Sequence, residues 1–105
     1  MRKDDRYQAN SDFVPREIAG EYILVPVGEA AGKFNGLASL NPAGVFLWKL
    51  LAQPRTGQEL SDALAKEYEL TGEQSDQDVG DFLDLAMSRN LVLPLAGQVP
   101  NPEQV

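Results

Sequence analysis

Apolar positions follow two different rhythms along the chain, strand-like before position 40 and helical after it. Residues 13–18 and 21–27 are rich in β-branched and aromatic side chains, and only Ala19-Gly20 separates them. The pattern therefore predicts a β-hairpin with a tight turn. A third short strand is predicted over residues 34–39, with a bulge or kink at Asn35-Gly36.

Two prolines limit the predicted sheet. Pro15 and Pro26 have no backbone N–H, so they belong at strand ends or on outward-facing edges. We therefore expect a small sheet with exposed margins. The unpaired backbone groups of such a margin are available for pairing with another chain.

The clearest helix start follows the third strand. Asn41 can accept from the free N–H groups of a first helical turn, and Pro42 gives up only an N–H that would have no partner there. Residues 45–51 are apolar except for Lys49, and a helix that is apolar nearly all round must be surrounded by protein. We expect this helix at the centre of the core, with Trp48 buried.

Two further helices are predicted after position 55. The first begins at Thr56, which forms a capping box with Glu59, and the second begins at Ser75, paired with Asp78. The residues at core spacing on the first of these helices are Leu60, Ala63, Leu64 and Tyr68. Those on the second are Val79, Phe82, Leu83 and Ala86. A short extension, residues 91–94, is expected to lie against the body of the domain.

Two apolar residues of the last helix, Leu85 and Met87, lie off its core row, with Arg89 near the same end. At least one of them should face solvent or a partner. Single exposed apolar residues are common, so Leu85 is either incidental or covered by a tail, or it is a contact in a groove. The sequence leaves both interpretations open.

The chain has 105 residues and a net charge of −7, with no cysteine and no histidine. It therefore has no disulfides or thiolate ligands, and it lacks the usual general base. We expect one folded domain over residues 12–95, with disordered tails at 1–11 and 96–105. The aspartates of the last helix, Asp76, Asp78, Asp81 and Asp84, are expected in its first turns as a solvated face, because they lack the spacing of a calcium loop. No catalytic residue, metal site or cofactor is predicted.

The predicted fold class is α+β: a three-stranded antiparallel sheet followed by three helices, in a winged helix-turn-helix-like arrangement. That arrangement raises DNA binding as a possible function. A DNA-binding face needs Lys and Arg to displace counterions from phosphates, and the candidate recognition helix has four aspartates against one arginine. We therefore expect no nucleic-acid partner. No apolar run is long enough for a membrane span or a signal peptide, so a cytoplasmic protein is expected.

Several short patterns, in this order and spacing, resemble the PqqD family of small proteins related to pyrroloquinoline quinone synthesis protein D, also called RiPP recognition elements. The matching segments are Arg16-x-x-x-Gly20, Ile23-Leu-Val-Pro26, Leu40-Asn41-x-x-Gly44-x-x-x-Trp48-x-Leu-Leu51, Thr56-x-x-Glu59-Leu60, Glu67-Tyr68 and Asp78-Val79-x-x-Phe82-Leu83. The resemblance covers roughly residues 13–93. One departure is Ala86, which stands where a larger residue is common and leaves more room beside the last helix.

The resemblance implies a non-catalytic peptide chaperone. It would bind the leader segment of a ribosomally synthesised precursor peptide by strand addition and present it to a modifying enzyme, such as a radical SAM maturase or a leader peptidase. The implied peptide-binding residues are Asn35, Gly36, Leu37, Ala38 and Ser39 on the third strand, with Phe82, Leu85 and Arg89 on the last helix.

A second class of function fits the same residues. The chain would then be an acidic winged-helix interaction module, or a regulator without DNA binding, with an unrelated protein partner. A short precursor-peptide gene beside a maturase gene would favour the chaperone. The sequence does not determine which alternate residues of the third strand face a ligand.

Overall fold

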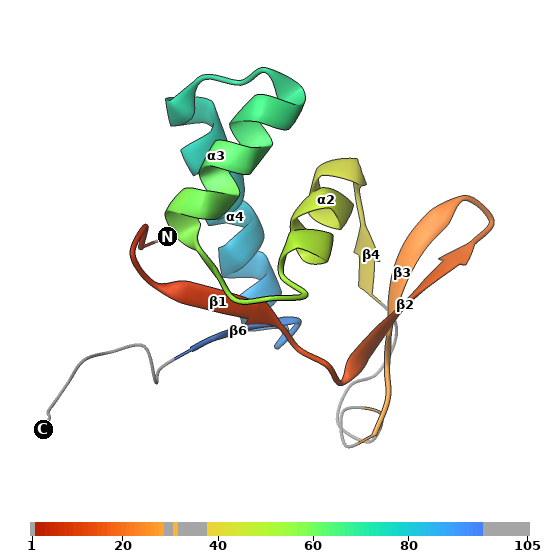
Figure 1. Cartoon of the computed structure of the whole chain (residues 1–105). Helices are drawn as coiled ribbons and strands as arrows, with labels where there is room; N and C mark the ends of the chain where they lie inside the picture. Colours follow the sequence, from red (N-terminus) through yellow and green to blue (C-terminus); the bar gives the residue numbers. More distant parts are fainter. Residues whose placement is uncertain (1, 29–30, 32–37, 96–105) are drawn as a thin grey trace, which may run out of the picture.

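The computed structural model describes residues 2–28, 31 and 38–95, and it has the predicted α+β class (Figure 1). A three-stranded antiparallel sheet has the order β2-β3-β4, and three helices follow it in sequence. The strands are β2 (Phe13–Ile18), β3 (Glu21–Pro26) and β4 (Ala38–Leu40). The helices are α2 (Pro42–Leu50), α3 (Gly57–Tyr68) and α4 (Gly72–Ser88).

The predicted hairpin is confirmed. Ala19 and Gly20 have φ angles of 54° and 83°, as a type I′ turn requires, and the turn matches the twist of the flanking strands. Pairing runs from Ile18 opposite Glu21 to Phe13 opposite Pro26 without a bulge. The predicted bulge at residues 35–36 lies outside the described residues.

The outer edge of β2 is poor in hydrogen-bond donors. The Val27 N–H donates to the Asp12 carbonyl at 2.7 Å, so the hydrogen-bonded pairs of the hairpin fall on even-numbered β2 positions. Odd-numbered residues therefore point their backbone groups outward. Of these, Pro15 has no N–H and the Phe13 N–H donates to the Asn10 carbonyl at 3.1 Å, which leaves Glu17 as the outward donor.

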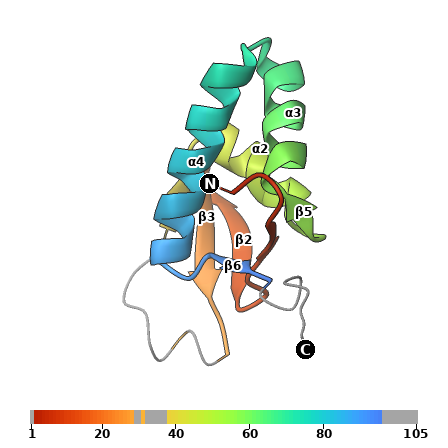
Figure 2. The same cartoon turned by 90° about the vertical axis from the view of Figure 1, so that its left-hand side faces the viewer.

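The expectation of a disordered segment over residues 1–11 is wrong for its second half. Arg6–Ala9 forms β1, which pairs with β5 (Arg55–Thr56) on one side and with β6 (Val92–Pro94) on the other. These strands form a second sheet below the helices (Figures 1 and 2). The segment is mostly polar, but Tyr7 is only 3% exposed and Ala9 packs against the core, so these two residues attach the strand to it. Residues 96–105 lie outside the described part.

The N-terminal residues also provide hydrogen-bond acceptors for the first turn of α3. The Gln58 and Gly57 N–H groups donate to the carbonyls of Lys3 and Asp5, each at 3.1 Å, so orphan donors of this helix start are satisfied by the chain start. The Lys3 Nζ lies 2.8 Å from an Asp76 carboxylate oxygen on α4. This ion pair, with a hydrogen bond from the Ser61 hydroxyl, lowers the pKa of Asp76, and the same carboxylate raises the pKa of Lys3.

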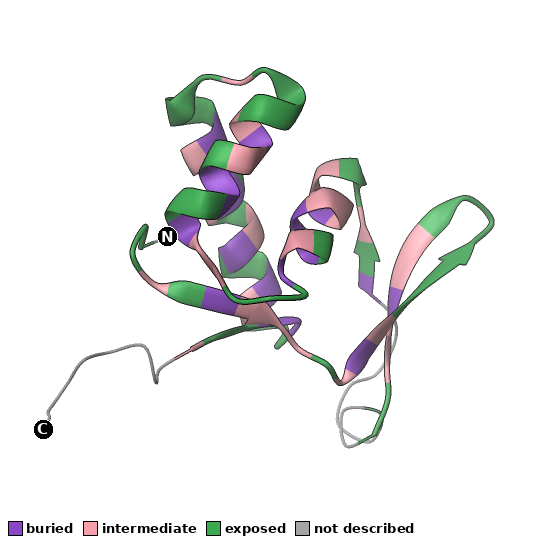
Figure 3. Ribbon diagram, viewed as in Figure 1, coloured by how far each residue is buried: buried purple, intermediate pink, exposed green. Residues whose placement is uncertain are grey.

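The core is built around α2, as predicted. Leu47 and Leu51 are fully buried and Trp48 is 6% exposed. Figure 3 shows buried segments on all three helices. Tyr68 is a correction, because it is 43% exposed and its ring contacts Phe46 edge-on at 6.1 Å between centroids. It lies in the last turn of α3, beyond the reach of the core. The other fully buried apolar residues include Leu24, Leu60, Leu64, Val79, Leu83 and Val92.

Helix α4 begins earlier than predicted. Its N-cap is Thr71, whose hydroxyl accepts from the Gln74 N–H at 3.1 Å while the Gln74 side chain accepts from the Thr71 N–H. Ser75 is instead completely buried, and its hydroxyl lies 2.7 Å from that of Ser61 on α3. Ser75 therefore connects α3 and α4 and is not the N-cap of α4. Asp81 and Asp84 consequently lie beyond the first turns of the helix, where they were expected.

Trp48→Ala should lower the free energy of unfolding by about 3–5 kcal/mol, because it removes a large buried side chain from the central helix. Ile18→Ala is the matched control, since Ile18 is 52% exposed at the hairpin tip and should change stability by less than about 0.5 kcal/mol. Urea unfolding followed by circular dichroism measures both. Equal effects of the two substitutions would contradict the central position of α2.

The Lys3–Asp76 ion pair gives a defined pH window. The pKa of Asp76 is lower in the folded state than its ordinary value of 3.8, so the ionised carboxylate stabilises the fold at pH values above 3.8. This stabilisation is lost as the pH falls through the folded-state pKa. The pKa of Lys3 is higher in the folded state than 10.5, so the charged amine stabilises the fold at pH values below 10.5. This stabilisation is lost as the pH rises through the folded-state pKa. Asp76→Asn should therefore be less stable than wild type at pH 7 and equal to it in strong acid. A constant difference down to pH 2 would contradict this, and Asp84→Asn controls for the loss of charge.

Candidate functional site

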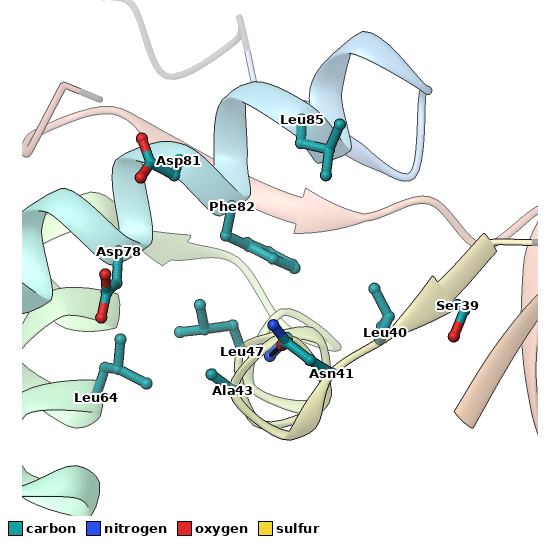
Figure 4. A pocket seen from close by; sticks show the side chains of 11 residues that line it. Ser39, Leu40, Asn41, Ala43, Leu47, Leu64, Asp78, Asp81, Phe82 and Leu85 are labelled. Carbon is teal, nitrogen blue, oxygen red and sulfur yellow. Dashed lines mark hydrogen bonds between the residues drawn. The ribbon is translucent and has the colours of Figure 1, made fainter. Parts of the chain in front are cut away.

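A pocket of about 390 Å³ lies between the end of β4 and helix α4, over the start of α2 (Figure 4). We call it the β4–α4 pocket. Its walls are largely apolar, and polar groups occupy parts of its rim. The lining residues are Ser39, Leu40 and Asn41 at the end of β4, Ala43, Gly44 and Leu47 on α2, Leu64 on α3, and Asp78, Asp81, Phe82 and Leu85 on α4.

Strand β4 forms one side of the pocket and is an edge strand. It pairs with β3 on one side, with Ser39 opposite Ile23 and Ala38 opposite Leu24. In the hairpin, Leu24 is not hydrogen-bonded to β2, so its backbone groups point towards β4 and meet those of Ala38. The alternation then directs the N–H and C=O of Ser39 away from the sheet, to the free edge.

The β4 edge is held in place by the start of α2. The Asn41 side chain accepts from the Gly44 N–H at 2.7 Å and so caps the helix directly after the strand ends. A Cβ at Gly44 would lie 3.1 Å from the Asn41 carboxamide oxygen and 3.5 Å from the Leu40 Cβ. A side chain at this position would therefore crowd the Asn41 cap at the junction of strand and helix.

Helix α4 forms the opposite side. Phe82 is half-buried against the core, whereas Leu85 is 56% exposed, the largest exposed fraction among the large apolar residues of the described part. In Figure 4, Phe82 points down towards α2 and Leu85 lies above the end of β4. Leu85 lines the pocket, so its side chain is available for a groove contact, and a ligand contact at this position stays a prediction.

In the described part of the chain, two charged residues line the pocket, and both are acidic. Asp78 and Asp81 are exposed, and the Asp81 carboxylate accepts from the Gln77 side chain at 3.0 Å. The pocket therefore has an apolar wall and a negatively charged rim. Within the described ranges, no group of three or more acidic, His or Cys side chains could hold a metal ion, and no helix is long and apolar enough to cross a membrane.

The predicted site residues are only partly brought together. Ser39, Phe82 and Leu85 line the pocket. Ala38 is buried in the core, and Arg89 is exposed just after the end of α4, so neither belongs to the lining. Asn35, Gly36 and Leu37 lie outside the described residues. Ala86 is buried towards the core, so its small size does not widen the pocket.

Sequence reasoning missed the acidic rim and the contribution of α2. Asp78 was interpreted as a helix-start residue, although it precedes Phe82 by four positions, a spacing that puts both on one helix face. That spacing was the available signal. Ala43 and Leu47 gave none, because a core residue and a pocket-floor residue look alike in sequence.

The family model described as "Coenzyme PQQ synthesis protein D (PqqD)" matches residues 21–92, more than half of the chain. Among solved structures, the fold is similar to that of "TbiB1 in Complex with the TbiA(beta) Leader Peptide". The TM-score is 0.67 at 22% sequence identity, and the match covers 85% of this chain and 98% of that one. No curated protein matches the sequence.

Leu85→Asp should change the free energy of unfolding by less than about 1 kcal/mol, because the side chain is exposed. Leu83→Asp, two residues away, would bury a carboxylate in the core and should prevent folding. Thermal unfolding followed by circular dichroism distinguishes the two. Strong destabilisation by Leu85→Asp would show that Leu85 belongs to the core and not to the pocket.

Proposed function

Because the chain belongs to the PqqD family, we propose that it binds the leader segment of a ribosomally synthesised precursor peptide in the β4–α4 pocket. The leader would add an antiparallel strand to the edge of β4. Its main chain would pair with the outward N–H and C=O of Ser39, and an apolar side chain would enter between Phe82 and Leu85.

The observation that carries the proposal is the meeting of a free strand edge and an apolar pocket. The backbone of an edge strand supplies affinity for any extended chain, and the adjacent pocket supplies selection among side chains. Both features are needed, because an edge alone would pair with any strand. The exposed Leu85 is then explained as a surface that the ligand covers.

The structure of TbiB1, which has a similar fold, supports a leader peptide as the ligand. TbiB1 was solved in complex with a leader peptide, and the two chains share a fold. The PqqD family match points in the same direction.

The role that follows is presentation, not catalysis. Without Cys or His in the chain, and with two aspartates as the charged groups at the pocket, the site is better suited to holding a peptide than to changing it. The modifying enzyme would be a radical SAM maturase or a leader peptidase. We place this step in the cytoplasm, where ribosomal precursors are made.

The direct test is a titration of the full chain with the leader of a precursor peptide encoded beside it. Backbone amide shifts should change most at Ser39 and along α4 from Asp78 to Leu85, and least at the hairpin tip. The folded Leu85→Asp variant should lose most of this binding. Binding of a folded protein partner, with no shifts for the leader, would instead favour the acidic interaction module.

The register of β4 distinguishes strand addition from binding in the pocket alone. Ser39→Pro removes an outward N–H and should leave the domain folded but unable to pair with the leader. Ala38→Pro removes an N–H that points to β3 and should destabilise the sheet. Circular dichroism and the same titration measure both effects. If Ser39→Pro folds and binds as wild type does, the leader does not pair with β4.

A further inference from the structure

The β4–α4 pocket is chemically different at its two ends. Asp78, Asp81, Phe82 and Leu85 are spaced three and four residues apart, so they share one face of α4. Figure 4 shows the two carboxylates at one end of this row and Leu85 at the other, with Phe82 between them. A ligand lying along α4 would therefore meet acidic groups at one end and an apolar surface at the other.

Among the residues that the structure describes, no cationic side chain neutralises the two carboxylates. The ion pairs of the described part, Arg2–Asp5 and Lys3–Asp76, involve neither of them, and the Gln77 amide that contacts Asp81 is uncharged. No lysine or arginine of residues 2–28, 31 and 38–95 lines the pocket. The net charge of −7 adds to the negative potential, so a cationic ligand group is favoured here and an anionic one is repelled.

We propose that the pocket selects peptides in which Lys or Arg stands next to an apolar anchor, with Asp78 and Asp81 as the residues that determine this preference. The proposal rests on the proposed function, because it names the chemistry of the peptide that the pocket holds. The chemistry of the pocket defines the peptide that fits it. An apolar side chain of the peptide would pack against Phe82 and Leu85, and a cationic side chain would pair with the acidic rim.

The geometry sets the spacing within the peptide. Phe82 follows Asp78, and Leu85 follows Asp81, by four residues, which is about 6 Å along the helix axis. Side chains on the same face of an extended strand lie about 6.6–6.8 Å apart, two residues along the chain. The basic residue should therefore stand two positions from the apolar anchor.

The direction of the ladder sets which residue comes first. From Ser39 to Asn41 the chain runs towards the end of the pocket where Asp78 lies (Figure 4). A peptide that pairs antiparallel with β4 runs in the opposite direction. The peptide residue that contacts the acidic rim therefore comes earlier in the peptide sequence than the residue that contacts Leu85. The expected pattern is a Lys or Arg two positions before the apolar anchor.

The test is selection from a display library of random twelve-residue peptides on the purified full chain. Enriched sequences should carry the basic residue two positions before an apolar one. In a synthetic copy of an enriched peptide, changing that Lys or Arg to Gln should weaken binding about three- to tenfold, because an exposed ion pair contributes up to about fivefold and two carboxylates are present. A change to Glu should weaken it further, and added salt should reduce the difference.

Variants of the protein test whether Asp78 and Asp81 cause the preference for a basic peptide. Asp78→Asn combined with Asp81→Asn should reduce the preference for the basic peptide over its Gln analogue to about twofold or less. Asp84→Asn is the control, because Asp84 is an exposed aspartate of the same helix that does not line the pocket. It should leave the preference unchanged.

The outcomes separate the two proposals. If no peptide is enriched and no leader binds, the proposed function fails and this inference fails with it. If peptides bind through Ser39 and Leu85 but Lys, Gln and Glu analogues bind equally, the proposed function stands and the charge preference is overturned. An equal loss of preference in Asp84→Asn would also overturn it, because the effect would then come from net charge and not from the rim.

Discussion

The junction between β4 and α2 is the constraint on which the pocket depends. Asn41 ends the strand and caps the helix in a single residue, and Gly44 lets the two elements approach closely. The buried face of α2, with Leu47 and Trp48, then fixes this junction to α3 and α4. Core packing thus holds the free edge of β4 at a set position opposite α4.

The features that were predictable from sequence are local ones. The hairpin, the Asn41 cap, the Thr56 capping box and the buried Trp48 each follow from a few adjacent residues, and the structure confirms them. The start of α4 was misplaced because two helix starts compete within five residues. Thr71 with Gln74 forms the cap, whereas burial against Ser61 draws Ser75 into the helix interior.

The features that were not predictable depend on long-range pairing. Strand β1 has few apolar residues, and its partners β5 and β6 lie about fifty and eighty-five residues further along the chain. The orientation of Ser39 has the same origin. It follows from the register of three strands, and a shift by one residue would exchange the inward and outward groups. The exposure of Leu85 likewise becomes visible only when α4 is packed.

The poor outer edge of β2 has a consequence for stoichiometry. A three-stranded sheet has two edges, and each could in principle accept a strand. At β2, Pro15 lacks a donor and the Phe13 N–H is already used by Asn10, so a ladder there would have a single outward donor among three positions. The β2 edge of this sheet is therefore a poorer acceptor for an added strand than the β4 edge. Under the proposed function, we expect one peptide per chain on this sheet, bound at β4.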